Sequence, residues 1–196
     1  MSGAENNYRL LIGKLDEFIR KYYQNLLIRG VIITAAIVLS GYFLLSLLEY
    51  YSYLSVQVKT LLFFLFLGVS AGSLVWLVLI PLLAYFRLGR VIDHETAAEI
   101  IGRHFSGVKD KLLNTLQLQE MAGKAEGSRE LILASIDQKI IDLRPVPFTA
   151  AVNLKENRKF VKYALVPAAV IAVMVFAAPN ILKDGTYRLV HYARLR

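Results

Sequence analysis

The chain contains no cysteine, and this absence removes several kinds of chemistry at once. Without thiols there is no disulfide, no thiolate metal ligand and no cysteine nucleophile. The sequence also lacks a glycine-rich phosphate loop ending in Lys-Ser or Lys-Thr, and it lacks the G-x-S-x-G turn of serine hydrolases. The residues therefore offer little support for a catalytic mechanism, and we expect neither catalytic residues nor a cofactor.

Charged residues are missing from three long apolar stretches, which lie at residues 31–48, 60–86 and 163–182. A helix rises about 1.5 Å per residue, so each stretch crosses or nearly crosses a hydrocarbon core of about 30 Å. A hydrophobic content of 56% also fits a membrane protein better than a soluble one. Helices buried inside a soluble domain are the alternative, which three stretches of spanning length disfavour. We predict transmembrane helices over residues 30–49, 60–86 and 163–182.

The apolar stretches have few features that suggest transport. None of them contains Asp, Glu, Lys, Arg or His, whereas ion-coupled transporters usually place such groups there. This absence counts against a pump or carrier mechanism within the chain, although subunits can share a pathway. Pro81 removes one backbone donor near the far end of the second stretch and should bend that helix.

The net charge of +8 comes from basic residues that largely flank the apolar stretches. This pattern is typical of membrane topology rather than of a nucleic-acid-binding face. Lys and Arg are frequent before residue 30 and at both ends of the segment 87–162, whereas the loop 50–59 contains only Lys59. The positive-inside rule therefore predicts a cytoplasmic N-terminus, a cytoplasmic segment 87–162, and an external loop and external tail (183–196).

Residues 1–29 lack the apolar core of a secretory signal peptide and follow an amphipathic pattern instead. Apolar residues recur at helical spacing: Tyr8, Leu11, Ile12, Leu15, Phe18, Ile19, Tyr22, Tyr23 and Leu26. Such a helix can lie in the membrane interface, or it can pack on the segment 87–162 or on a second copy of itself. Its polar face carries both acids and bases, which favours packing on protein, because interfacial helices are usually richer in Lys and Arg.

The segment 87–162 has the pattern of a small helical domain. We predict helices that start at residue 94 and that cover 108–121 and 129–143, the last of them ended by Pro145. The first helix has an apolar face made of Ala97, Ala98, Ile100 and Ile101. A domain of this size buries little core alone, so we expect it to pack on the helix 1–29 or on a neighbouring subunit.

The stretch from His94 to Ala98, HETAA, matches the first two letters of the zinc-protease motif H-E-x-x-H. The motif needs a second histidine where this chain has Ala98, and His104 lies about 15 Å further along a helix. Asp93 instead suits an N-cap, with Glu95 in the first turn, where negative charge is favourable. We therefore predict no metal site. A metal enzyme that uses His94, Glu95, Glu99 and His104 remains an alternative hypothesis.

Small residues are spaced for close helix packing in two of the predicted spans. Gly68 and Gly72 form a G-x-x-x-G motif, and Ala164, Ala168 and Ala172 recur every fourth residue. Small side chains let helix backbones approach closely, which drives association in lipid. We predict that these five residues pack spans of this chain, or of neighbouring subunits, against each other. The alternative is that small residues are simply frequent in membrane helices.

The middle segment and the tail resemble a bacterial family. The residues that carry the resemblance are 94–119, HETAAEIIGRHFSGVKDKLLNTLQLQ, especially 110–118, together with DGTYRLVHY at 184–192. They are similar to the N-terminal region of large inner-membrane proteins termed domain of unknown function 4175. The resemblance implies a continuation into a long extracytoplasmic, helical and low-complexity region, so that 183–196, which alternates like the start of a strand, begins a larger part. It implies no catalytic residue.

These observations predict an all-α membrane protein with three transmembrane helices, an N-terminal amphipathic helix and a small cytoplasmic helical domain between the second and third spans. The leading hypothesis is a non-enzymatic anchor and assembly module of a larger bacterial envelope protein or complex in the inner membrane. Its expected partners are membrane lipids and further copies of the chain or other envelope membrane proteins, but not nucleic acid. A subunit of a transport or export complex and a metal-dependent membrane enzyme are the alternatives.

Overall fold

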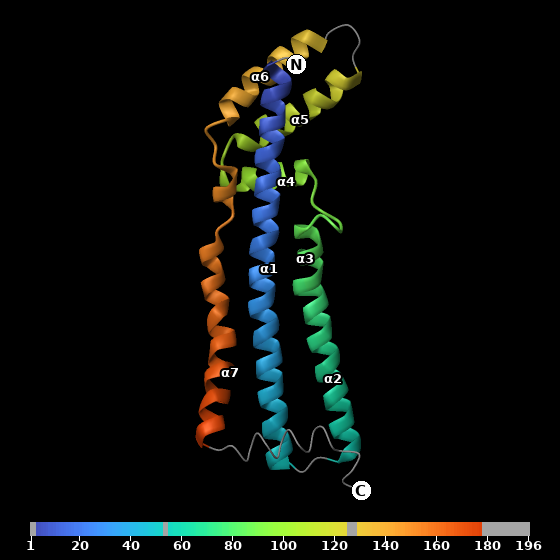
Figure 1. Cartoon of the computed structure of the whole chain (residues 1–196), viewed down its shortest axis with the longest axis vertical. Coiled ribbons are helices and arrows are strands. Elements are labelled where there is room, and N and C mark those ends of the chain that lie inside the picture. Colours follow the sequence, from blue (N-terminus) through green and yellow to red (C-terminus); the bar gives the residue numbers. More distant parts are fainter. Residues whose placement is uncertain (1–2, 53–54, 125–128, 178–196) are drawn as a thin grey trace. The chain divides into compact units, whose positions relative to one another are not determined.

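The computed structural model describes residues 3–52, 55–124 and 129–177, and Figure 1 shows its helices. In these ranges the elements are α1 (Gly3–Ser52), α2 (Val56–Leu74), the π-helix η1 (Val75–Leu79), α3 (Ile80–Tyr85), α4 (His94–His104), α5 (Val108–Lys124), α6 (Arg129–Leu143), the 3-10 turns η2 (Phe148–Ala151) and η3 (Leu154–Asn157), and α7 (Arg158–Ala177). All of these elements are helical, so the predicted all-α class is confirmed for this part of the chain. The predicted start of a strand in the tail lies outside the described residues.

Three helices are long and apolar enough to cross a membrane, as predicted: Asn6–Ser52, Val56–Tyr85 and Phe148–Ala177. In the most apolar window of each, only 11%, 0% and 6% of the residues are buried. Apolar side chains that stay exposed over this length are expected where lipid, rather than water, is the solvent. The predicted third span, 163–182, extends past Ala177 into residues outside the described part.

The predicted amphipathic helix 1–29 and the predicted span 30–49 form one uninterrupted helix. α1 contains 50 residues and has no proline, and Gly30 remains helical within it. The helix also continues to Ser52, and α2 starts at Val56, so the connection is shorter than the predicted loop 50–59. Glu49 therefore lies inside a helix rather than at its end.

The chain forms two compact units, and α1 contributes to both. The domain unit consists of Met1–Gln24 and Ala84–Asn153, and the span unit consists of Asn25–Leu83 and Leu154–Arg196. The predicted domain 87–162 thus lacks its last residues, which belong to the span unit, and gains the start of α1. The small helical segment alone has too little apolar surface for a core, and the first turns of α1 supply the missing face.

The core of the domain unit is built on the apolar stripe of α1. Its buried apolar residues are Leu11, Leu15, Phe18, Ile19 and Tyr23 from α1, Ala84, Ala97, Ala98 and Ile101, Leu112 and Ala122 from α5, Ile136, Ile140 and Leu143 from α6, and Phe148 and Val152. Two hydrogen bonds also join this part of α1 to the rest of the domain unit: Asn7 donates to Asp137 (2.6 Å), and Lys21 donates to the Thr149 carbonyl (3.0 Å). Packing on protein, rather than on lipid, therefore accounts for the amphipathic pattern of this helix.

The helix α4 starts as its sequence predicts. The Asp93 carboxylate accepts a hydrogen bond from the Thr96 amide at 2.7 Å, which satisfies a donor that the first turn leaves free. This hydrogen bond holds the pKa of Asp93 below its usual range. Ala97, Ala98 and Ile101 are fully buried on the predicted apolar face. HETAA is therefore a capped first turn whose small residues pack inward.

In the span unit α1 pairs antiparallel with the helix formed by α2, η1 and α3 (Figure 1). Residue numbers increase along α1 while those of the contacting residues decrease along the partner helix. Gly30 lies against Leu77, Thr34 donates to the Ser73 carbonyl (3.4 Å), Gly41 lies against Phe66, and Glu49 pairs with Lys59. The turn η3 packs on α1 through a hydrogen bond between Asn157 and Asn25 (2.7 Å), and the start of α7 packs on it through Phe160, whose ring centre lies 4.4 Å from Arg29.

The disturbance predicted at Pro81 takes the form of a π-helical turn. Pro81 has no N–H to donate to the carbonyl four residues earlier, which belongs to Leu77, and its ring would collide with that carbonyl in a regular helix. The wider turn Val75–Leu79 relieves this collision, and the Ile80 amide bonds to the Val75 carbonyl five residues back. The Leu77 carbonyl faces Gly30, where a Cβ atom would lie 1.7 Å from its oxygen. Only glycine fits there.

Candidate functional site

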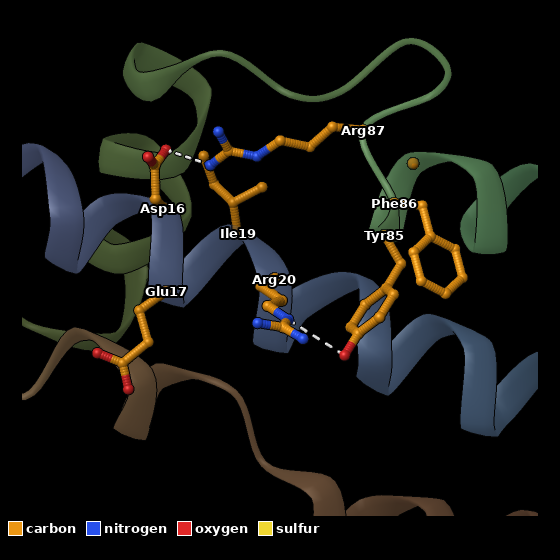
Figure 2. A pocket seen from close by; sticks show the side chains of 8 residues that line it. Asp16, Glu17, Ile19, Arg20, Tyr85, Phe86 and Arg87 are labelled. Atoms are coloured by element: carbon orange, nitrogen blue, oxygen red, sulfur yellow. Dashed lines mark hydrogen bonds and ion pairs between the residues drawn. The ribbon is translucent and has the colours of Figure 1, made fainter.

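A pocket of the domain unit lies between α1 and the end of α3 (Figure 2). It has a volume of about 450 Å³, and its lining residues are Asp16, Glu17, Ile19, Arg20, Ala84, Tyr85, Phe86 and Arg87. A smaller pocket shares Asp16, Ile19 and Arg87 and continues to His94. The two pockets together bring charged residues from α1 next to those that follow the second span.

Asp16 is the common partner in this site. Its Oδ1 atom lies 2.8 Å from Arg87 Nη2 and 3.0 Å from His94 Nε2. Partial burial alone would raise the pKa of Asp16, but the hydrogen bonds and positive charges of His94 and Arg87 outweigh this effect and lower the pKa. Asp16 therefore stays ionised and ties the connection after α3 and the first turn of α4 to α1.

Arg87 adopts an unusual backbone conformation at the end of α3. Its φ of 58° places it in the left-handed region, which glycine occupies without strain and other residues rarely adopt. The Arg87 amide bonds to the Ala84 carbonyl (3.0 Å), which closes the last turn of the helix. The ion pair with Asp16 holds a strained residue in place, and it aims the guanidinium across the pocket, as Figure 2 shows.

Arg20 and Tyr85 form the opposite wall of the pocket. Arg20 Nε donates to the Tyr85 hydroxyl at 3.1 Å, and its guanidinium carbon lies 5.1 Å from the centre of the Tyr85 ring. This cation–π contact adds to the hydrogen bond in holding Arg20 beside Tyr85. Phe86 follows and is 61% exposed. The site therefore combines two guanidinium groups with aromatic side chains at the end of an apolar span.

The contribution of Asp16 to the free energy of unfolding can be tested by varying the pH. The pKa of Asp16 is lower in the folded protein than the value of about 3.9 in an unfolded chain. The ionised carboxylate therefore stabilises the folded state above about pH 4. That contribution is lost as the pH falls through the folded pKa. Asp16 is partly exposed, so we expect less than about 1 kcal/mol. The difference in unfolding free energy between the wild type and Asp16→Asn should shrink between pH 6 and pH 3; a constant difference would contradict the ion pair.

The residues of the hypothetical metal site have other partners. His94 contacts Asp16, and Glu99 pairs with Lys109 at 3.5 Å. The His104 ring lies against Phe105. No group of three or more His, Asp or Glu side chains among the described residues has the arrangement that holds a metal ion. The structure therefore does not bring His94, Glu95, Glu99 and His104 together.

The small residues predicted to pack helices differ in their surroundings. A Cβ atom added to Gly68 or to Gly72 would meet nothing within 4 Å, and both residues are exposed. On α7, Ala164 and Ala168 are half-buried and Ala172 is exposed. Within this chain the close contacts of α1 and α2 are made by Gly30 and Gly41 instead. In the part of the chain that the structure describes, no side chain or backbone covers the G-x-x-x-G face of α2 at its two glycines.

The structure also reveals a buried ion pair that sequence reasoning overlooked. The side chain of Glu49 is 1% exposed and that of Lys59 is 13% exposed, with Oε1 and Nζ 2.5 Å apart. Glu49 Oε2 and the neighbouring Ser46 Oγ are buried without a hydrogen-bond partner in the described part of the chain. Glu49 directly follows the uncharged stretch 31–48, and Lys59 is the single base of the predicted loop 50–59, so their closeness along the chain was the available signal.

The comparisons with known proteins do not add a relative. No family model matches the chain, and no curated protein or solved structure is similar to it. The fold itself defines the class, which is an all-helical protein with three helices long and apolar enough to cross a membrane. The resemblance of residues 94–119 to domain of unknown function 4175 stays a prediction.

Proposed function

We propose that this protein is a non-enzymatic membrane anchor and assembly module of a larger bacterial envelope protein or complex. The asymmetry of its basic residues supports a cytoplasmic domain unit and an external connection between α1 and α2, in the inner membrane. The resemblance to domain of unknown function 4175 supports the envelope setting. Neighbouring copies or other membrane proteins are the partners of such a module.

One observation carries this proposal: α2 has an open small-residue face. The residues of α2 that contact α1, Phe66 and Ser73, lie on one side of the helix. At about 100° per residue, Gly68 and Gly72 lie on the opposite side. Leu61, on the same side as the glycines, is 66% exposed. Because α1 does not use this face, it remains available to a helix of another chain, whose backbone the two glycines would allow to approach closely.

The double variant Gly68→Ile, Gly72→Ile tests assembly through this face. We expect association in detergent and in native membranes to weaken at least about tenfold, or about 1.4 kcal/mol, because isoleucine keeps the partner backbone at a distance. The fold of the chain should not change, since the added side chains meet open space. Analytical ultracentrifugation and crosslinking measure the association.

A matched control is Ala71→Ile, which adds a similar side chain to an exposed position of the same helix, beside the glycine face. This variant should associate as the wild type does. If the double variant assembles as tightly as the wild type, the open face is not the contact between subunits.

A transport or export subunit is the second candidate, and Glu49 favours it. An ionisable residue buried within a membrane-spanning helix often marks a substrate or proton pathway. Lys59 neutralises Glu49, however, which suits a structural role equally well. Reconstituted flux that is lost in Glu49→Gln or on changes along α2 would favour transport over anchoring.

A further inference from the structure

Two guanidinium groups line the same pocket from different segments, and within residues 3–52, 55–124 and 129–177 most of their donors have no hydrogen-bond partner. An arginine has five N–H donors in a planar fork. Arg20 uses Nε for the Tyr85 hydroxyl, and Arg87 contacts Asp16 through Nη2. Both arginines line the same pocket, and Figure 2 shows Arg87 reaching to Asp16 and Arg20 reaching to Tyr85. Arginines that line one pocket suit a phosphate group, which a guanidinium binds through charge-assisted, bidentate hydrogen bonds.

The pocket lies beside the end of the second candidate span. Tyr85, on its wall, is the last residue of the second candidate span. Phe86 and Leu88 follow immediately and are 61% and 75% exposed, which suits the boundary between acyl chains and headgroups. Ile19 adds apolar surface to the lining. A ligand with both a phosphate and an acyl part fits this combination better than a soluble phosphate does.

The acidic residues of the lining do not prevent phosphate binding. Asp16 is already paired with Arg87 and in contact with His94, and its ion pair positions the Arg87 guanidinium. Glu17 is exposed, and in Figure 2 its carboxylate points away from Arg87. The left-handed backbone of Arg87 is maintained although it is strained, which is typical of residues held for binding.

We propose that this pocket binds the phosphate group of a membrane phospholipid, with Arg20 and Arg87 as its donors and Phe86 and Leu88 against the acyl chains. The inference goes beyond an anchoring function, because it assigns a specific lipid site at one membrane boundary. It does not depend on assembly through α2, so either proposal can fail alone.

A lipid titration of the full chain tests this site. The protein is purified in detergent, and binding of phosphatidylglycerol is followed by native mass spectrometry. We expect the variant Arg20→Gln, Arg87→Gln to bind about tenfold more weakly or worse, because it loses two charge-assisted contacts to the phosphate. The control Arg9→Gln, Arg103→Gln makes the same change of charge at two exposed arginines that do not line the pocket, and it should bind as the wild type does.

Two further arms keep the test decisive. Diacylglycerol, which lacks the phosphate, should bind the wild type as weakly as phosphatidylglycerol binds the double variant. Asp16→Asn keeps the shape of the site but removes the ion pair that positions Arg87, so it should weaken phosphatidylglycerol binding several-fold, whereas the control Arg9→Gln, Arg103→Gln should not. Equal loss in the control variant, unchanged binding by Asp16→Asn, or inorganic phosphate that binds as tightly as the lipid would each overturn the proposal.

Discussion

Gly30→Ala should destabilise the span unit by about 3 kcal/mol or more, the largest effect expected for alanine at any of the seven glycines whose surroundings are described. The new Cβ would lie 1.7 Å from the Leu77 oxygen and 2.7 Å from its carbonyl carbon. Both atoms belong to the backbone of η1, so no rotamer change relieves the collision, and α1 must separate from its partner helix. Detergent-induced unfolding measures the loss, and Trp76 in η1, the single tryptophan of the chain, reports it by fluorescence.

Two other glycines of α1 provide a graded comparison. Gly13→Ala meets nothing within 4 Å and should stabilise the protein by about 0.5–1 kcal/mol, because alanine loses less backbone entropy in a helix. Gly41→Ala would approach the Phe66 ring at 2.8 Å, and a side chain can move, so its effect should fall between the other two. Equal stability of Gly30→Ala and Gly13→Ala would refute the close contact of Gly30 with Leu77.

Lys59→Met should destabilise the hairpin of α1 and α2 by about 3–5 kcal/mol, because it leaves the buried carboxylate of Glu49 without its counter-ion. The additional change Glu49→Leu removes that charge and should restore most of the loss, since an apolar pair of similar volume replaces a buried ion pair at little cost. The wild type, both single variants and the double variant form a mutant cycle that isolates the interaction. The midpoint of detergent-induced unfolding supplies the four values.

The exposed ion pair of Lys109 and Glu99 is the matched control for this cycle. Its side chains are 48% and 49% exposed and 3.5 Å apart, so solvent screens the attraction. Lys109→Met should therefore change stability by less than about 1 kcal/mol. If Lys59→Met has an equally small effect, the pair does not hold α1 to α2.

The sequence alone could place those residues whose apolar or polar pattern shows whether they avoid or face water. The three apolar stretches stand out because no charge interrupts them. Asp93 could be recognised as a cap, and Ala97, Ala98 and Ile101 as a buried face, because α4 alternates apolar and polar residues at helical spacing. The stripe of α1 up to Tyr23 follows the same rule, and its mixed charges favoured the protein packing that the structure contains.

Within the spans this contrast disappears, because lipid is as apolar as leucine and periodicity no longer marks the packed side. The motif of Gly68 and Gly72 was visible in the sequence, yet Gly30 and Gly41 make the close contacts of α1 with α2. That choice depends on the antiparallel register of the two helices, which a single sequence does not encode locally.

Tertiary structure likewise decides the pocket of Asp16, Arg87 and His94, whose members are far apart along the chain. The sequence by itself determined that this protein is helical, that three of its segments can cross a membrane and where α4 begins, since hydrophobicity and capping act over a few residues. Only the tertiary structure decided which glycines touch a neighbouring backbone and which charges meet, because both follow from how distant helices are set against each other.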